Sequence, residues 1–340
     1  MREVAELAGV SIATVSAVFT GKSWVSPDTD AGVRRAAGQL GYEPRGRKTA
    51  APSREPRMVG FVSWGSDMST GTSPYFAPVL AGAQQACAEL RLSISFETVD
   101  PEAGELPLCV QRGEVSGLVV LSVGSDPDYL RRIHEAGVSC VLLEHAVKGL
   151  PMDFVRHDDE IGGYLATRHL LDLGHTNPPP AIITAKDRIA PAVERLTGYR
   201  RALAEYGLRE EPSFVRRSDF SIDTGYEQMA ALLALPVRPS AVFCGNDESA
   251  LGALNALRDH GVAVPEEMSV IGYDDIAMAG HASPALTTMA VDKELLGAQA
   301  VWHLVQRIQR PGMTSRDTRL GVTLVQRQST APPGDPGRRA

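Results

Sequence analysis

The segment VAELAGVSIATVSAV at residues 4–18 predicts two short helices joined by a tight turn. Apolar residues recur at helical spacing on both sides of Gly9. Glycine adopts the left-handed backbone conformation at little steric cost, so Gly9 is expected to end the first helix. Ser11 then offers a side-chain oxygen that can cap the second helix. The segment therefore predicts a helix, a turn and a second helix.

A third helix is predicted a few residues further on. Ser26 followed by Pro27 is typical of a helix start, because serine caps the helix and proline is tolerated in its first turn. Val33, Ala37 and Leu40 then form an apolar face that we expect to be buried. This layout matches a helix-turn-helix DNA-binding module, and the pattern alone fits a small helical cap on a larger enzyme equally well.

The composition is that of a soluble globular protein. At 340 residues the chain is long enough for two or three compact units. It is 43% hydrophobic and 22% charged, and no apolar run approaches the roughly 20 residues of a membrane span. The first residues include two glutamates and lack the apolar stretch of a signal peptide. We therefore expect a cytoplasmic protein with no membrane partner.

The sequence predicts no metal site, no cofactor and no enzyme activity. His169 and His175 lie six residues apart and do not share a helix face. Asp158-Asp159 resembles a pair of catalytic carboxylates, but no nucleophile or glycine-rich phosphate loop accompanies it. The cysteines form no CxxC pair and are expected to be buried, reduced thiols: Cys87, Cys109, Cys140 and Cys244.

Charge is distributed unevenly along the chain. The net charge is −7, yet residues 1–57 hold nine basic against six acidic residues, whereas the remainder holds 25 against 35. A mildly basic head on an acidic body fits a small DNA-binding module joined to a part that does not bind DNA.

The head resembles the DNA-binding head of the LacI/GalR family of bacterial transcriptional regulators. Four blocks carry the resemblance: VAELAGVS (4–11), TVS (14–16), VSP (25–27) and LGYEP (40–44). The resemblance implies that residues 1–44 form the head and that its second helix enters the major groove. The residues implied to contact phosphates are Ser11, Thr14 and Ser16. Those implied to face base edges are Ile12, Ala13 and Ala17.

Two departures from the family pattern concern DNA recognition. Ala17 stands where the family usually has arginine, which can contact guanine with about 1–3 kcal/mol of discrimination. In the linker 45–57, the leucine of the family's hinge helix falls on Ala51, and Pro52 would stop that helix. We expect a basic tether that contacts phosphates, or else an ordinary solvated linker. Its first basic residues are Arg45, Arg47 and Lys48.

From Met58 onward, short apolar runs alternate with helical stretches. Strands are predicted at Met58–Ser63, Ser93–Phe96, Leu118–Leu121, Cys140–Leu143, Ala181–Thr184, Ala241–Cys244 and Ser269–Gly272. Helices are predicted near Tyr75–Leu90, Pro127–Ala136, Glu160–Leu173 and Ile189–Tyr206. Alternation of this kind predicts an α/β fold with parallel sheets covered on both faces, here as two doubly wound lobes divided near residue 156. Ligands of such sheets bind beyond the carboxyl ends of the strands.

This half also resembles the LacI/GalR family. The matching blocks are PYFA (74–77), DDEIGG (158–163), HLLDLGH (169–175), RLTGY (195–199), DFS (219–221), NDESALG (246–252), GYDD (272–275) and PALTT (284–288). The resemblance implies the fold of type I periplasmic binding proteins over residues 58–330, in which the chain crosses between lobes three times. We expect the first lobe at about 58–156 and 288–313, the second at about 157–287 and 314–330, and a disordered tail at 331–340.

The resemblance also implies an effector site in the cleft between the lobes. Arg195 matches the family's effector anchor, and Asn246 and Asp274 match positions that hydrogen-bond a ligand. Tyr75 and Phe220 resemble aromatic walls of the site. The further candidates are Phe76 and Asp158. The alternatives are a solvated charge for Arg195, a core position for Phe220 and a loop cap for Asp274.

We therefore interpret the chain as a homodimeric, allosteric transcriptional repressor in the bacterial cytoplasm, associated with the nucleoid. It is expected to bind operator DNA under the control of a small molecule, with a sugar favoured and a nucleoside or purine second. The departures at Ala17, Ala51 and Pro52 support an alternative, a small-molecule sensor with weak specific DNA binding.

Overall fold

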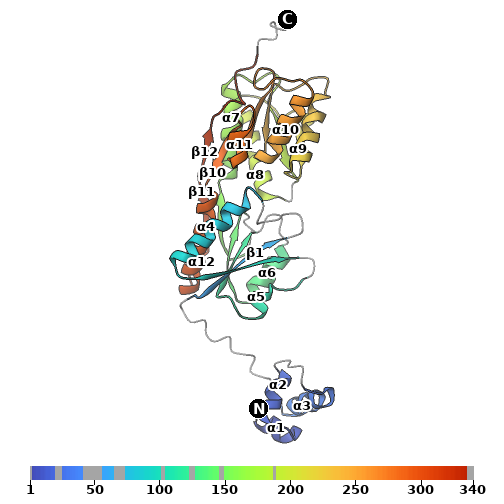
Figure 1. Cartoon of the computed structure of the whole chain (residues 1–340), viewed down its shortest axis with the longest axis vertical. Helices are drawn as coiled ribbons and strands as arrows, with labels where there is room; N and C mark the ends of the chain where they lie inside the picture. The colour runs from blue at the N-terminus through green and yellow to red at the C-terminus, as the bar shows by residue number, and fades with distance from the viewer. Residues whose placement is uncertain are drawn as a thin grey trace. The chain divides into compact units, whose positions relative to one another are not determined.

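The computed structural model describes residues 2–19, 25–40, 56–64, 73–100, 104–121, 127–144, 149–186 and 189–334. The chain divides into two compact units, residues 1–53 and 54–340, each of which is considered by itself. Figure 1 shows a first unit of helices and a second unit of helices and sheets. The predicted boundary of the head at residue 44 and the linker residues Arg45, Arg47 and Lys48 lie outside the described residues.

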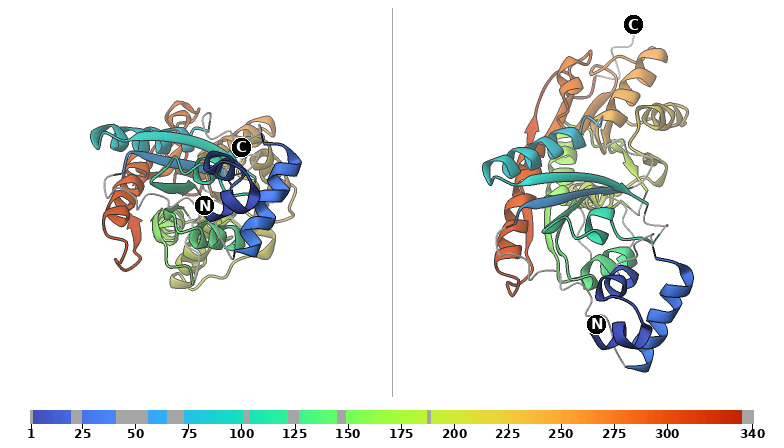
Figure 2. Two further views of the ribbon diagram at one scale, coloured as in Figure 1. Left: turned by 90° about the horizontal axis from the view of Figure 1, so that it is seen from below. Right: turned by 60° about the horizontal axis from the view of Figure 1, so that its bottom comes forward.

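The first unit contains the three predicted helices: α1 (Arg2–Ala8), α2 (Ile12–Phe19) and α3 (Pro27–Gln39), seen most clearly in Figure 2. Gly9, at φ 64°, makes the turn between α1 and α2. Ser26 caps α3 by accepting a hydrogen bond from the amide of Thr29. The core of this unit consists of Val4, Ala5, Val15, Val18, Val33, Ala36 and Ala37. Leu40 was expected in this core and is instead 44% exposed, because it follows the last turn of α3.

The second unit is built on two six-stranded sheets. The first has the order β11-β5-β4-β3-β1-β2 and the second the order β12-β10-β9-β8-β6-β7. All strand pairs are parallel except β10 and β12. The strands of the first sheet are β1 (Met58–Trp64), β2 (Ser93–Val99), β3 (Gly117–Leu121), β4 (Ser139–Leu143), β5 (Asp153–His157) and β11 (Asp317–Leu320). Those of the second are β6 (Ala181–Ala185), β7 (Val215–Ser218), β8 (Ala241–Cys244), β9 (Ser269–Asp274), β10 (Thr287–Val291) and β12 (Val322–Val325).

Helices cover both faces of each sheet. On the first sheet, α4 (Phe76–Glu89) and α12 (Lys293–Gln309) pack together on one face, and α5 (Leu108–Gln111) and α6 (Pro127–Glu135) lie on the other (Figure 1). On the second, α7 (Asp159–Asp172) and α8 (Ala190–Glu205) cover one face, and α9 (Ile222–Leu233) and α10 (Asp247–Asp259) cover the other. The short helices η2 (Pro212–Phe214) and α11 (Ala277–His281) complete this half. We call the two halves the first and second lobes, and they confirm the predicted pair of doubly wound lobes.

The chain crosses between the lobes three times, but at positions that differ from two of the predicted boundaries. β5 ends in the first lobe at His157, and α7 begins the second. Residues 287–291 form β10 of the second sheet, so the boundary expected at 288 lies after Val291. Residues 317–320 form β11 of the first sheet, so the boundary expected at 314 lies after Leu320. Strand pairing decides which lobe these short segments join, and hydrophobic periodicity carries no information about it.

Residues 331–334 contradict part of the predicted disordered tail. The carbonyl of Ala331 accepts hydrogen bonds from Nε2 of His175 at 2.9 Å and from the hydroxyl of Ser269 at 3.0 Å. Both donors are buried, so the chain is anchored there against the second sheet. Residues 335–340 lie outside the described residues. Within the described part of the chain, no helix combines the length and the apolar character that a membrane span requires.

Candidate functional site

The predicted DNA-reading helix is capped by its own predicted contact residue. Ser11 Oγ accepts a hydrogen bond from the amide of Thr14 at 3.0 Å and lies 2.8 Å from the Thr14 hydroxyl. Ile12 and Ala13 are exposed at the start of α2, and Thr14 and Ser16 are half-buried. An exposed helix start with free solvent access to its first turn can approach a phosphate backbone or a groove edge.

Ala17 does not lie on this exposed face. Its side chain is only 3% exposed, together with the buried Val15 and Val18. The expectation that Ala17 faces base edges is therefore wrong, since the residue belongs to the interior of the head. The apolar part of the exposed face is limited to Ile12 and Ala13.

In the second lobe, Arg195 of α8 forms the centre of a buried polar group. Its side chain is 4% exposed, and Nε donates a hydrogen bond to Asp159 Oδ1 at 2.8 Å. Nη1 donates to the carbonyl of Gly245, and Nη2 lies 3.7 Å from Asp274 Oδ1. The guanidinium also lies 3.7 Å from the ring centroid of Tyr273. These contacts hold the planar group in one orientation and exclude a solvated surface charge.

Asp274 and Phe220 project from strand ends with unusual backbone conformations. Asp274 has φ 109° at the end of β9, and Phe220 has φ 70° after β7. The Phe220 ring is half-buried, with its centroid 5.9 Å from the Arg195 guanidinium. Asn246 caps α10 by accepting from the amide of Ser249 at 3.0 Å and donates to the carbonyl of Phe220 at 2.9 Å. Asn246 therefore holds the Phe220 loop in place, next to the buried polar group around Arg195.

A second polar group comes from the first lobe. The Tyr75 hydroxyl donates a hydrogen bond to Glu144 and lies 3.2 Å from Nδ1 of His157. His157 Nδ1 also lies 3.2 Å from the Glu144 carboxylate, and both residues are buried. Sequence reasoning identified Tyr75 and missed Glu144 and His157. Their positions in the chain could have identified them, because Glu144 follows β4 and His157 ends β5, both at the carboxyl edge of a parallel sheet.

The two groups share one electrostatic environment. Burial would raise the pKa of Glu144, but His157, the Tyr75 hydroxyl and Arg195 outweigh burial and hold it below the ordinary value. Burial would lower the pKa of His157, but the Glu144 carboxylate holds it above the ordinary value. Burial raises the pKa of Asp274 well above its ordinary range, against the opposing charge of Arg195. We call these residues the interlobe cluster: Tyr75, Glu144, His157, Asp159, Arg195 and Asp274.

Two carboxylate oxygens of the interlobe cluster accept no hydrogen bond. Among the described residues, neither Glu144 Oε2 nor Asp274 Oδ1 has a hydrogen-bond partner, although both atoms are buried. A buried acceptor without a donor is destabilising by about 1–3 kcal/mol. The two atoms come from opposite lobes, so a ligand with several hydroxyl groups could donate to both.

Two predicted site residues have other roles. Asp158 caps α7 by accepting from the amide of Ile161 at 3.4 Å, and its neighbour Asp159 contacts Arg195 instead. Successive residues at a helix start point in different directions, which explains the difference. Phe76 is buried in the core of the first lobe, with its ring centroid 4.9 Å from that of Tyr75. It therefore packs against Tyr75 as part of this core.

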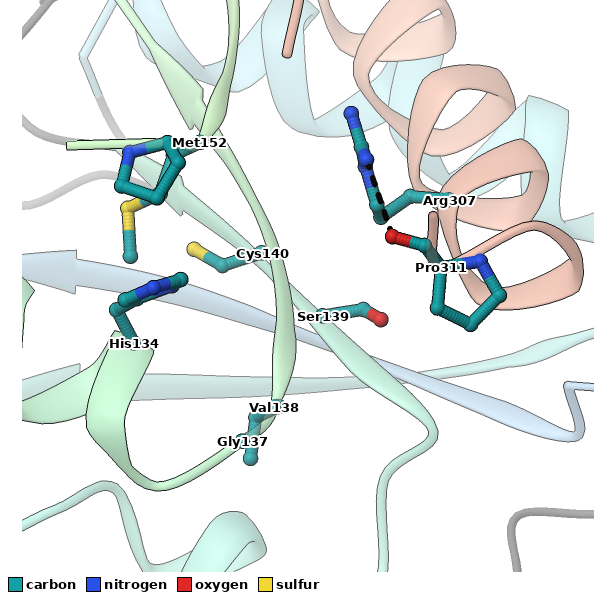
Figure 3. Close-up of a pocket in the computed structure, with 9 residues that line it drawn as sticks. His134, Gly137, Val138, Ser139, Cys140, Met152, Arg307 and Pro311 are labelled. Atoms are coloured by element: carbon teal, nitrogen blue, oxygen red, sulfur yellow. Dashed lines mark hydrogen bonds between the residues drawn. The ribbon is translucent and has the colours of Figure 1, made fainter. Parts of the chain in front are cut away.

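A separate cavity of about 180 Å³ lies in the first lobe (Figure 3). His134, Cys140 and Met152 line it, together with Arg307, which Asp153 holds at 2.7 and 3.0 Å. The cavity lies at the amino ends of β4 and β5, whereas Glu144 and His157 lie at their carboxyl ends. It is therefore distinct from the interlobe cluster.

A helix-turn-helix head and a two-lobed α/β body with a buried polar cluster define a ligand-responsive DNA-binding regulator. The model of the bacterial regulatory proteins, lacI family, matches residues 1–45, and that of the periplasmic binding protein-like domain matches residues 167–330. The ribose operon repressor of Haemophilus influenzae is 33% identical over 97% of this chain and 98% of its own length. The repressor PurR of the same organism is 34% identical over 91% and 90%. The chain belongs to the lacI family of bacterial regulatory proteins and is a ligand-controlled transcriptional repressor.

Solved structures agree with this assignment. A complex of the transcriptional regulator CelR with cellobiose is 31% identical, with a TM-score of 0.72 over 96% of this chain and 98% of that one. The Lac repressor dimer bound to operator and the anti-inducer ONPF is 28% identical, with a TM-score of 0.71 over 96% and 98%. A lacI-family regulator from Enterococcus faecium with bound ribose is 29% identical, with a TM-score of 0.72 over 81% and 99%. The predicted family and fold are confirmed.

Proposed function

We propose that the effector of this repressor is a neutral monosaccharide bound at the interlobe cluster. The observation that carries the proposal is the pair of unused buried acceptors, Glu144 Oε2 and Asp274 Oδ1, one from each lobe. Sugar hydroxyls donate to carboxylates, and aromatic rings such as Tyr75 and Phe220 pack against sugar C–H faces. The ribose operon repressor and the ribose-bound regulator among the relatives support the same ligand class.

The charges of the site favour a neutral ligand over a phosphorylated one. Arg195 is already engaged by Asp159, the Gly245 carbonyl and Asp274. A phosphate group would face the Glu144 carboxylate, whose pKa is held below its ordinary value, and would find no unengaged cation within the interlobe cluster. Like charges repel strongly at a buried site. A purine or nucleoside is the second candidate, supported by the half-buried Phe220 ring and by the relative PurR.

On the DNA side, we propose that two copies of the chain bind a pseudo-palindromic operator as a homodimer in the cytoplasm. Thr14 and Ser16 are half-exposed and can donate to phosphates, whereas Ile12 and Ala13 can contact thymine methyl groups. The basic residues Arg45, Arg47 and Lys48 would add phosphate contacts. The effector would act by favouring one relative orientation of the lobes, and it can change operator affinity only by its differential affinity for the two states.

The experiment is a calorimetric titration of the full-length protein with D-ribose, other neutral monosaccharides, D-ribose 5-phosphate, hypoxanthine and adenosine. We expect saturable binding of a neutral sugar and none of the phosphate. Ligand at about 100 times its Kd should add roughly 2.7 kcal/mol to the free energy of unfolding. Tight binding of hypoxanthine or adenosine without any sugar would replace the first candidate by the second.

DNA binding is tested by selecting genomic fragments that the protein retains and titrating them in gel shifts with and without the bound ligand. If the protein is a ligand-controlled regulator, we expect a sequence-specific complex with DNA whose affinity changes when the ligand is bound. Sequence-independent binding that only weakens with salt would support the alternative of a sensor with weak specific DNA binding. Recovery of the ligand unchanged would distinguish both the regulator and the sensor from an enzyme, because an enzyme would convert the ligand.

A further inference from the structure

Lys293 makes a contact between the lobes and is not one of the residues of the interlobe cluster. It is the first residue of α12, which packs against α4 in the core of the first lobe. Its Nζ donates hydrogen bonds to the carbonyls of Asp274, Asp275 at 3.3 Å and Val291 at 3.3 Å. An ammonium group has three N–H donors, so these three carbonyls can use all of them.

The carbonyls that Lys293 binds belong to an unusual backbone segment. Asp274 has φ 109° and Asp275 has φ 52°, two successive non-glycine residues in a region that L-residues rarely adopt. Each such conformation is unfavourable unless the surroundings of the residue hold it. This conformation turns the Asp274 side chain toward Arg195, with Oδ1 left without a hydrogen-bond partner among the described residues.

The other contacts of this segment come from the second lobe itself. Arg327 contacts the Asp275 carboxylate at 2.6 Å, and the amide of Ile276 donates to Asp247 Oδ2 at 2.9 Å. Both act beside or after Asp274, and β10 of the same lobe pairs with β9 as far as Asp274. Lys293 adds a contact to the Asp274 carbonyl from the first lobe. A change in lobe orientation that moves α12 would therefore withdraw a donor from the residue that faces the effector.

We propose that Lys293 is a positioning residue for the effector site. It holds Asp274 in its left-handed conformation and thereby makes the shape of the second-lobe site depend on the position of the first lobe. The proposal rests on the proposed role of Asp274 in binding the effector. Part of the coupling between ligand affinity and lobe orientation would then depend on the Lys293 side chain.

The first test needs no ligand. Hydrogen exchange is measured on the full-length protein, followed in the peptide that contains residues 274–278, for wild type, Lys293→Met, Lys293→Arg and Glu294→Gln. We expect exchange roughly tenfold faster in Lys293→Met, because the segment loses a contact that holds it. Lys293→Arg keeps a charge and several N–H donors and should restore most of the protection. Glu294 is exposed on the same turn of α12, so its variant should match wild type.

The second test is a double-mutant cycle with D-ribose as the probe. We expect Lys293→Met to raise the Kd about tenfold in the wild-type background and to have no further effect in Asp274→Asn, because residues that act through one another are not additive. Lys293→Gln replaces Lys293→Met if the latter aggregates. Unchanged exchange in both Lys293→Met and Lys293→Gln would overturn the proposal, as would additive effects in the cycle. If wild type does not bind D-ribose, the ribose prediction fails, and the exchange result alone decides the role of Lys293.

Discussion

Arg156 on β5 of the first lobe donates a hydrogen bond to Glu194 on α8 of the second lobe. The next residue in each element, His157 and Arg195, belongs to the interlobe cluster. Arg156 is held on its other side by Asp317, with distances of 2.8 and 2.6 Å. This ion pair therefore joins the lobes directly beside the interlobe cluster, and the Arg156 side chain is 9% exposed. Screening by solvent is limited at such a position.

Glu194→Gln is expected to change effector affinity without removing any effector contact. Loss of the carboxylate weakens one bridge between the lobes and shifts the balance of their orientations, for which we expect a change in Kd of roughly three- to tenfold. Titration calorimetry measures the affinity, and small-angle scattering without ligand measures the lobe arrangement. Glu160→Gln is the matched control, since Glu160 pairs with Arg201 of the same helix α8 inside the second lobe at 3.1 Å. Equal effects of the two variants would contradict this role.

Asp274→Asn should separate ligand binding from stability. We expect sugar binding to weaken by about a hundredfold, since asparagine has one accepting oxygen where the carboxyl group has two, and its amide nitrogen only donates. Because burial raises the pKa of Asp274 well above its ordinary value, its ionised form is unfavourable in the folded protein. The thermal midpoint without ligand should therefore stay the same or rise. A large drop in that midpoint would show that Asp274 is primarily structural.

His157 should make stability depend on pH in a defined direction. The Glu144 carboxylate holds the pKa of His157 above its ordinary value of 6.5, so the protonated imidazole is favoured in the folded state. Its stabilising contribution is complete below pH 6.5 and disappears as the pH rises through the folded pKa. Other histidines whose pKa burial lowers act in the opposite direction, so the prediction concerns the difference between wild type and His157→Asn.

The measurement is thermal denaturation of both proteins from pH 5.5 to 9. The advantage of wild type over His157→Asn should be largest at the acid end of this range and shrink toward the alkaline end. A difference that is constant across the range would mean that the imidazole acts only through packing or neutral hydrogen bonds.

Ser11→Ala tests the capped start of α2, the predicted DNA-reading helix. The variant removes the acceptor for the Thr14 amide, and the loss of such a cap destabilises a helix by about 0.5–2 kcal/mol. We expect faster hydrogen exchange in residues 12–16 and weaker operator binding, with the sugar affinity unchanged. Ser11→Asn keeps the capping oxygen and should keep the exchange pattern. If Ser11→Asn keeps the exchange pattern but still loses operator affinity, the hydroxyl also contacts DNA directly.

Local sequence patterns were enough to predict the helices of the head and the alternation of the body. Gly9 and Ser26-Pro27 act within a few residues, and buried parallel strands are recognisable as continuous apolar runs. Motifs that match the family identified Arg195 and Asp274 as site residues. The structure places them buried and 3.7 Å apart, and their role in effector binding stays a prediction.

The remaining features depend on contacts between residues distant in sequence. Glu144 and His157 meet Tyr75 across 69 and 82 residues, and Lys293 reaches Asp274 across 19 from the other lobe. Sequence determined the helices, most of the strands and the identity of the family, because helix caps, turns and hydrophobic periodicity act over short distances. Only the tertiary structure decided that Asp159 rather than Asp158 binds Arg195, that Ala17 is buried, and which lobe β10 and β11 join, because strand pairing and side-chain packing set these relations.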